Sequence, residues 1–375
     1  MILAQTTQAR LLGALQGVAG VVERRHTLPI LANVLLRKTG ASIELTTSDL
    51  ERQLRCRAEL GGDAVDFTTT LSARKLVEIL RAMPADQIVT LAATKNRVTL
   101  QGGDSRFTLQ TLPAEDFPLV QETADFGPAF ALPQARLRSL IEQVEFAMAV
   151  QDIRYFLNGL LFITEGRRLT LVASDGNRLA LAQVELDAQL PAHQVILPRK
   201  TVHELLRLMR EGGGASGDSS DTVTLRFAAA QARFDLAGIE FVSKLIEGRF
   251  PDYRRVIPTG HRKQFTLGRA PLLASLQRAS IMTNAKFRGV RMQVGPGALR
   301  IASSNAEHEE ADERLAVDYG GDGLEIGFNV SYLMDVLGHS SDELVTIALE
   351  DAQSSALFTF PAQAGFQYVV SPMRL

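Results

Sequence analysis

One sequence pattern occurs three times in this chain and sets the organisation of its fold. Ile43-x-Leu45-x-x-Ser48-Asp49 recurs 126 residues later as Leu169-x-Leu171-x-x-Ser174-Asp175, and Leu299-x-Ile301-x-x-Ser304-Asn305 is a third copy. A period of this length is too long for a solenoid unit and long enough for a domain. The repeat therefore predicts three similar domains in the 375 residues.

Further landmarks keep the same order and nearly the same spacing. The matching stretches are Ala9-Arg10-Leu11 with Ala135-Arg136-Leu137 and Ala270-Pro271-Leu272, "LANVLL" with "LNGLLF" and "FRGVRM", "LSARKLVEIL" with "LPRKTVHELL" and "FNVSYLMDVL", and Leu112-x4-Phe117-Pro118 with Leu245-x4-Phe250-Pro251. We expect domains at residues 1–125, 126–256 and 257–375. Their joins fall in polar, Gly/Pro-bearing stretches near residues 121–129 and 257–264.

Within each copy the coarse pattern is helix, strands, helix, strands. Residues 9–22 and 72–83 have apolar positions at helical spacing, and Ser72 is placed to cap the second of these helices. Residues 42–49 alternate with a period of two, as strands do. This pattern predicts α+β domains whose helices cover one face of an antiparallel sheet. The stretch "GGGASGDSSD" (212–221) is expected to form a flexible surface loop.

Composition excludes several classes of protein. Hydrophobic residues make up 46% of the chain and charged residues 22%, which is an ordinary globular balance. Cys56 is the only cysteine, so the chain cannot form an intrachain disulfide, and a reducing cytoplasm is the expected compartment. We expect no signal peptide and no membrane span, because no long uninterrupted apolar run occurs.

The net charge of −2 hides an uneven distribution. Basic residues concentrate in the first expected helix of each copy and in the second helix of the first two copies, at Arg10, Arg74, Lys75, Arg81, Arg136, Arg138, Arg199, Lys200, Arg207, Arg210, Arg269 and Arg278. The second helix of the third copy lacks this charge. Each such helix taken alone is typical of an ordinary solvated face. Their recurrence, with few aromatic residues between them, favours sequence-independent contacts to phosphates over base stacking.

Several stretches resemble one known family over the whole chain. They are "TLPILANVLL", "QDIRYFLNGLLF", "ASDGNRLA", "GRFPDYRRVIP", "KFRGVRM", "GFNVSY" and the terminal "PMRL", and they are similar to the bacterial DNA polymerase III beta subunits, the sliding clamps. The resemblance implies a head-to-tail homodimer of three-domain chains, closed as a ring with helices lining the hole and sheets outside. Such a ring encircles double-stranded DNA, tethers the replicative polymerase and is opened by an ATP-using clamp loader.

The resemblance also implies positions for the functional sites. Family DNA contacts match Arg25, Arg74, Gln151, Tyr155, Arg199 and Lys200. A pocket for short hydrophobic motifs of partner proteins matches Arg154, Leu157, Ser174, Gly176, Asn177, Arg178, Leu179, Pro251, Arg255, Val256, Asn329, Tyr332, Ser355, Val369, Val370, Ser371, Pro372, Met373 and Arg374. The dimer interface matches Arg106, Phe107, Leu109, Ile281, Met282, Glu307, Glu309 and Glu310.

This chain departs from the family pattern at three of its positions. Asn177 stands where the family often has histidine, and Ser371 stands where it often has methionine. A serine there replaces a flexible apolar side chain, so a less apolar pocket floor and a different peptide preference are expected. Asp104 stands where a basic residue is common, which removes one expected ion pair at the interface. Exposed ion pairs are worth only about 0–1 kcal/mol, so we expect closure to survive.

Three alternative functions rest on other residues. Ser174, Asp175 and His203 could serve a hydrolase, but no G-x-S-x-G turn surrounds Ser174. The acidic run "EHEEADE" could bind a metal, but the histidines lack paired ligand spacing. A sequence-specific DNA binder would need a helix-turn-helix, zinc finger or basic zipper, and none is evident. With no phosphate-binding GxxxxGK[ST] loop either, we expect a non-enzyme without metal or cofactor.

Overall fold

The computed structural model of the chain describes residues 1–22, 28–94, 96–211, 222–284, 286 and 288–374. The predicted loop at 212–221 and the predicted DNA contact Arg25 lie outside these residues. The chain forms two compact units, one of residues 1–137 and 203–245 and the other of residues 138–202 and 246–375. None of the described helices is long and apolar enough to cross a membrane.

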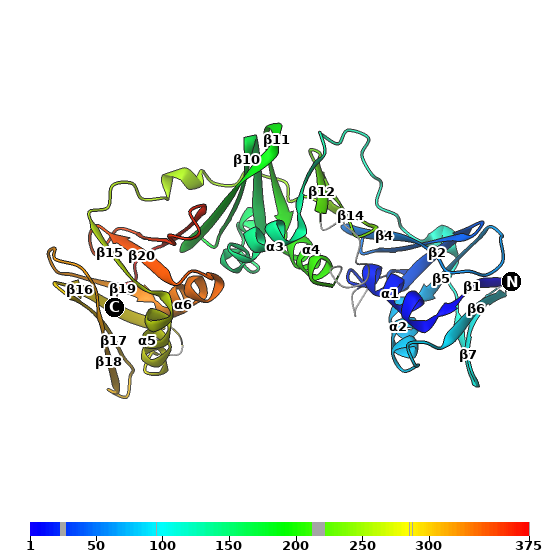
Figure 1. Cartoon of the computed structure of the whole chain (residues 1–375), viewed down its shortest axis with the longest axis horizontal. Coiled ribbons are helices and arrows are strands. Elements are labelled where there is room, and N and C mark those ends of the chain that lie inside the picture. Colours follow the sequence, from blue (N-terminus) through cyan, green and yellow to red (C-terminus); the bar gives the residue numbers. More distant parts are fainter. Residues whose placement is uncertain (23–27, 95, 212–221, 285, 287, 375) are drawn as a thin grey trace. The chain divides into compact units, whose positions relative to one another are not determined.

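The first unit contains a four-stranded antiparallel sheet and two helices, which pack mainly against the strands of residues 33–72 in a second sheet. The sheet has the order β1-β6-β7-β8, with strands β1 (Ile2–Thr7), β6 (Ile88–Thr94), β7 (Arg97–Gly102) and β8 (Ser105–Gln110). The helices α1 (Gln8–Ala19) and α2 (Ala73–Arg81) pack against each other (Figure 1). Leu11, Leu15 and Val18 of α1 and Leu76 and Leu80 of α2 are fully buried, so the apolar stripe of each helix forms the core.

The second sheet of this unit joins strands of two sequence repeats. Its order is β5-β2-β3-β4-β14-β13-β12-β9, and the central pair β4–β14 brings residues 52–56 beside residues 239–243. The strands are β2 (Asn33–Thr39), β3 (Ser42–Ser48), β4 (Arg52–Glu59), β5 (Phe67–Ser72), β9 (Phe130–Pro133), β12 (Thr222–Phe227), β13 (Gln231–Leu236) and β14 (Ile239–Lys244).

The other unit has the same two kinds of sheet. A six-stranded sheet of order β10-β11-β22-β21-β20-β15 again joins two repeats, through the pair β11–β22. Its strands are β10 (Gly159–Ser174), β11 (Arg178–Pro198), β15 (Lys263–Gly268), β20 (Leu344–Leu349), β21 (Ala356–Thr359) and β22 (Phe366–Val370).

A four-stranded sheet of order β18-β17-β16-β19 completes this unit. Its strands are β16 (Gly289–Gly295), β17 (Ala298–Ser304), β18 (Glu310–Ala316) and β19 (Leu324–Asn329). Helices α5 (Arg269–Ile281) and α6 (Val330–His339) lie side by side (Figure 1), as α1 and α2 do in the first unit. The middle repeat supplies helices α3 (Gln134–Glu142) and α4 (Arg199–Glu211).

The observed elements confirm the α+β fold of three similar copies. Each copy runs strand, helix, strands, helix, strands, and the helices begin where the repeated landmarks predicted them. The predicted cap is only partly right, because Ser72 precedes α2 but its side chain makes no capping hydrogen bond. Thr7 and Asn329 do cap α1 and α6, with side-chain oxygens that accept from the backbone N–H groups of Arg10 and Ser331.

Candidate functional site

The Ser174–Asp175 pair is built into a tight turn between β10 and β11. The Ser174 hydroxyl donates to the Arg178 carbonyl at 2.7 Å and accepts from the Gly176 N–H at 3.1 Å. One carboxylate oxygen of Asp175 accepts from the N–H groups of Asn177 and Arg178, and the other pairs with the Arg178 guanidinium at 3.0 Å. Both side chains are therefore used to hold the turn, which is a structural role and not the arrangement of a nucleophile and its base.

The first repeat contains the same turn. Asp49 accepts from the N–H groups of Glu51 and Arg52 and pairs with the Arg52 guanidinium at 2.6 Å. The third residue of the turn has a positive φ in both copies, +77° at Leu50 and +90° at Gly176. This agreement supports the interpretation of Ser174–Asp175 as architecture that recurs in the repeats.

Beside the second turn lies a pocket of about 250 Å³ within one compact unit. Its apolar wall includes Leu157, Leu179, Phe250 and Val369, all buried in a single hydrophobic cluster. Polar groups lie at the rim, as is usual for a site that binds part of an apolar ligand. The remaining lining residues are Arg154, Phe156, Ser174, Gly176, Asn177, Arg178, Pro251, Tyr253, Val256 and Ser371.

Arg178 is fixed from several sides. Its guanidinium pairs with Asp335 of α6 at 2.5 Å and donates to the Phe146 carbonyl at 2.8 Å. The guanidinium carbon also lies 4.5 Å from the ring centroid of Tyr332, a distance at which a cation is attracted to the ring face. Residues from three segments thus hold this one polar group of the pocket in place.

Arg154 is a second charged residue of the pocket lining. It pairs with Asp152 at 2.8 Å and donates to the Asp175 carbonyl at 3.1 Å, next to Gly176. A Cβ on Gly176 would lie 2.7 Å from both terminal guanidinium nitrogens of Arg154. Glycine is therefore required here both by its positive φ and by the close approach of Arg154.

Two pKa values at the site are shifted from their ordinary range. The side-chain hydrogen bond from Arg154 is the main reason that the pKa of Asp152 falls to about 2. Burial, reinforced by the nearby Asp175 carboxylate, raises the pKa of the Tyr332 hydroxyl. At neutral pH Asp152 is therefore an anion that orients Arg154, and Tyr332 is a neutral ring.

The lining contains eleven of the nineteen residues expected in the pocket: Arg154, Leu157, Ser174, Gly176, Asn177, Arg178, Leu179, Pro251, Val256, Val369 and Ser371. The other eight lie outside the lining: Arg255, Asn329, Tyr332, Ser355, Val370, Pro372, Met373 and Arg374. Tyr332, one of these eight residues, still supports the pocket because its ring lies against the guanidinium of Arg178. The backbone amide of Ser371 donates to the Asn177 carbonyl at 2.8 Å, which ties the C-terminal segment to the turn.

Sequence reasoning missed Phe156, Phe250 and Tyr253 as lining residues. A signal for Phe250 was present, because Phe250-Pro251 is one of the repeated landmarks.

The residues expected to contact DNA lie in both compact units. Arg74 projects from α2 with two thirds of its side chain exposed and pairs with Glu78 at 2.7 Å. Gln151 lies in an exposed loop with a φ of +53°, and Tyr155, 56% exposed, begins the short 3-10 helix Tyr155–Leu157. Arg199 is half-buried and donates to the Met148 carbonyl at 3.1 Å, whereas Lys200 is exposed.

Two of the basic helix residues have structural roles instead of forming a solvated basic face. Arg207 pairs with the buried Glu204 at 2.6 Å and donates to the Gln16 carbonyl at the end of α1. Arg269 donates to the carbonyls of Leu337 and Asp342, near the end of α6. The count of basic residues on the helices therefore overstated the charge available to phosphates.

The residues expected at a dimer interface lie at two sheet edges, β8 and β18, and at the end of helix α5. Within the described part of the chain β8 pairs only with β7, and β18 pairs only with β17. Phe107 on β8 is 38% exposed, while Leu109 is buried. Ile281, at the end of α5, is 73% exposed, next to the half-buried Met282. Arg106 on β8 is exposed, as are Glu307, Glu309 and Glu310 at the start of β18.

Comparison with known proteins identifies the family of the chain. Residues 5–121, 131–252 and 254–374 match the N-terminal, central and C-terminal domains of the DNA polymerase III beta subunit. The beta sliding clamp of Pseudomonas aeruginosa is 45% identical over 371 residues, which covers 97% of this chain and 98% of that protein. The chain belongs to the DNA polymerase III beta subunit family.

Solved clamp structures have the same fold. A Pseudomonas aeruginosa sliding clamp bound to griselimycin is 43% identical with a TM-score of 0.93, and the Caulobacter crescentus clamp, with polyethylene glycol at a putative beta-motif tethering region, is 35% identical with a TM-score of 0.93. Each comparison covers all of both chains. The function of this clamp is accordingly that of its family, which is processivity of DNA polymerase III.

Proposed function

We propose that two copies of this clamp join head to tail into a ring around double-stranded DNA. The observation that carries this proposal is the pair of open sheet edges, β8 at one end of its sheet and β18 at one end of another. An unpaired edge presents N–H and C=O groups to a second strand. Joining β8 of one copy to β18 of the next, twice, gives a closed heterologous assembly.

The side chains at the two edges suit this joint. Phe107 and Ile281 leave apolar surface exposed, which association would bury. Arg106 beside β8 and the acids Glu307, Glu309 and Glu310 beside β18 supply opposite charges. The Glu309 carboxylate already accepts from Asn305 at 2.6 Å, so Glu307 and Glu310 are the better partners for Arg106.

Processivity in this proposal comes from enclosure and not from tight binding. Arg74, Gln151, Tyr155, Arg199 and Lys200 would make weak contacts to phosphates as the ring slides, with Arg25 added by the family resemblance. Such contacts do not depend on base sequence and weaken as salt rises. A polymerase tied to the ring stays at high effective concentration near the primer end and rebinds before it diffuses away.

We assign the pocket beside the 174–178 turn to the partner proteins. Its apolar wall and fixed polar rim suit a short extended segment with one or two large apolar side chains. The replicative polymerase, the clamp loader and other motif-bearing proteins would compete for it. A Pseudomonas aeruginosa relative binds griselimycin, and we propose that this compound occupies the same pocket in this chain, where it serves as a probe.

The remaining features of the proposal follow from the same role. The clamp would have three domains at residues 1–125, 126–256 and 257–375, no catalysis of its own and no cofactor. The reduced, buried Cys56 suits the cytoplasm, where replication of bacterial DNA takes place.

The ring is tested by loading the clamp, with a clamp loader, onto a nicked circular plasmid. Gel filtration in high salt then measures how much clamp stays with the DNA, first with the intact circle and again after the circle is cut once with a restriction enzyme. A ring stays with the circle and leaves the linear form, because only the circle has no ends. Equal retention on both forms would mean that the clamp binds DNA by contact alone, and the proposal would be wrong.

A further inference from the structure

The chain contains two versions of one structural joint. In each, the strand after a Ser-Asp turn pairs with a strand of the next repeat, as β4–β14 in one unit and β11–β22 in the other. Each joint also has a segment that begins after a Phe-Pro pair, which is Phe117-Pro118 at the first joint and Phe250-Pro251 at the second. Only the second joint has been given a function above, as the partner pocket.

Equivalent positions on the two paired strands differ in chemistry. Leu179 and Leu181 of β11 belong to the apolar cluster under the pocket. The residues that occupy the same positions in β4 are Gln53 and Arg55. Leu179 lies opposite Val369 across the second joint, and Gln53 lies opposite Val242 across the first.

At the first joint these polar residues bind the segment that follows Phe117-Pro118. The carbonyl oxygen of the Gln53 side chain, which is almost fully buried, accepts from the Val120 N–H at 3.0 Å. Gln231 on β13 donates to the Gln121 carbonyl at 2.6 Å and accepts from the Thr123 N–H at 2.9 Å. Three backbone groups within residues 120–123 are thus held by side chains of the sheet.

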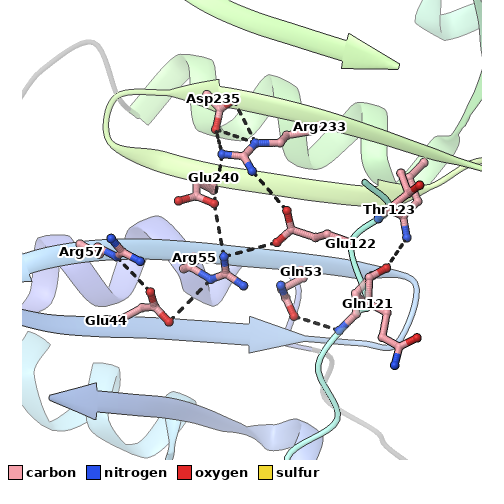
Figure 2. Close-up of polar contacts among 12 residues, drawn as sticks. Glu44, Gln53, Arg55, Arg57, Gln121, Glu122, Thr123, Arg233, Asp235 and Glu240 are labelled. Atoms are coloured by element: carbon pink, nitrogen blue, oxygen red, sulfur yellow. Dashed lines mark hydrogen bonds and ion pairs between the residues drawn. The ribbon is translucent and has the colours of Figure 1, made fainter. Parts of the chain in front are cut away.

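The Glu122 carboxylate holds the same segment through charge. It lies between Arg55 of β4 and Arg233 of β13, at 3.3 Å and 3.2 Å (Figure 2). Glu240 of β14 also contacts both arginines, at 3.4 Å and 3.2 Å. All these side chains are about a quarter exposed, so the network is shielded enough to be stronger than an ordinary surface pair.

The corresponding segment of the second joint is not held in this way. Val120, Glu122 and Thr123 correspond to Tyr253, Arg255 and Val256. The N–H groups of Arg255 and Val256 bond within their own short turn, to the carbonyls of Asp252 and Tyr253. The Arg255 side chain pairs only with the adjacent Asp252 among the described residues and is mostly exposed.

We infer that the first joint is a closed counterpart of the partner pocket, held shut by Val120–Thr123, and that Gln53 and Glu122 are the residues that keep it closed. Leucine at the position of Gln53 in the second joint offers no acceptor, and the equivalent segment there packs Tyr253 on the apolar cluster and lines the pocket with Tyr253 and Val256. Within the described residues the second joint holds the pocket, and at the first joint side chains of the sheet hold the Val120–Thr123 segment. The functional meaning of this inference rests on the proposed role of the second joint.

Hydrogen exchange of the Val120 and Thr123 amides tests the closure directly. Gln53→Leu removes the acceptor and should speed exchange at Val120 roughly 5- to 10-fold, the loss expected for one hydrogen bond. Glu122→Gln should speed exchange of the same segment to a smaller extent. Gln53→Glu keeps an acceptor oxygen and should restore protection, which shows that the effect does not come from misfolding.

Gln121→Ala is the matched control, because the Gln121 side chain is exposed and only its carbonyl is used. Strands β13 and β14 should exchange at the wild-type rate in every variant. Unchanged exchange at Val120 in Gln53→Leu, or an equal effect of Gln121→Ala, would overturn the inference.

Calorimetric titration of the wild-type clamp with griselimycin provides the second readout. One molecule bound per chain is the expected result, and two per chain would contradict a closed first joint. No binding at all would count against the assignment of the second pocket to partner ligands and would leave the exchange test to decide on Val120–Thr123.

Discussion

Replacing Gly176 by alanine tests how the partner pocket is built. An alanine at a φ of +90° is strained by about 1–2 kcal/mol. Its Cβ would also meet both terminal nitrogens of Arg154 at 2.7 Å, so Arg154 must move and lose its hydrogen bond to the Asp175 carbonyl. That loss adds about 1 kcal/mol. Because Arg154 and Gly176 both line the pocket, we expect griselimycin to bind roughly tenfold more weakly.

Gly166→Ala separates the two effects. Gly166 has a φ of +60° and nothing within 4 Å of an added Cβ, so it shares the backbone strain without the contact. The melting temperature should therefore fall about 2–4 °C further for Gly176→Ala than for Gly166→Ala, because Gly176→Ala loses about 1 kcal/mol more from the displaced Arg154 hydrogen bond. Griselimycin affinity should change only in Gly176→Ala. Equal melting shifts together with unchanged affinity would refute the role given to Arg154 and Gly176.

Three further predictions follow from the same structure. Phe107→Ala should weaken dimerisation by about 2 kcal/mol at each joint, because roughly 75 Å² of the ring is left to bury, and sedimentation analysis would measure this loss. Ile88→Ala, also at an exposed apolar residue, should leave dimerisation unchanged. Leu50→Gly should raise the melting temperature by relieving the φ of +77°, a net gain of about 0.5–1 kcal/mol, and a lower melting temperature would contradict it. The pKa of Asp152 is lowered to about 2. The contribution of Asp152 to stability is therefore fully present above its ordinary pKa of about 4 and is lost as the pH falls through about 2. A carboxyl NMR titration would follow this change, and a midpoint at the ordinary pKa would contradict the prediction.

The sequence predicted the fold well because the three copies share their spacing. The Ser-Asp turn recurs because Asp49 and Asp175 each hold two backbone N–H groups and one arginine, a local arrangement that needs no distant partner. Alternating strands and amphipathic helices are likewise local patterns. Such features can be read from a single sequence.

The parts that could not be predicted depend on contacts between distant residues. Asp335 lies 157 positions from the Arg178 that it holds, and Gln231 is more than 100 positions from the segment that it binds. Arg207 and Arg269 resembled surface charges until the structure placed backbone carbonyls within reach of them. These roles depend on contacts between residues far apart in the sequence, and neither the periodicity nor the composition of a sequence predicts such contacts.

The mass of the wild-type protein in solution, measured by light scattering across a dilution series, decides whether two copies form a ring. We expect a species of twice the 40.9 kDa of one chain, maintained to low concentration, because open edges β8 and β18 on each copy close two joints at once. A single chain at every concentration would rule out the ring, since one copy cannot close around DNA.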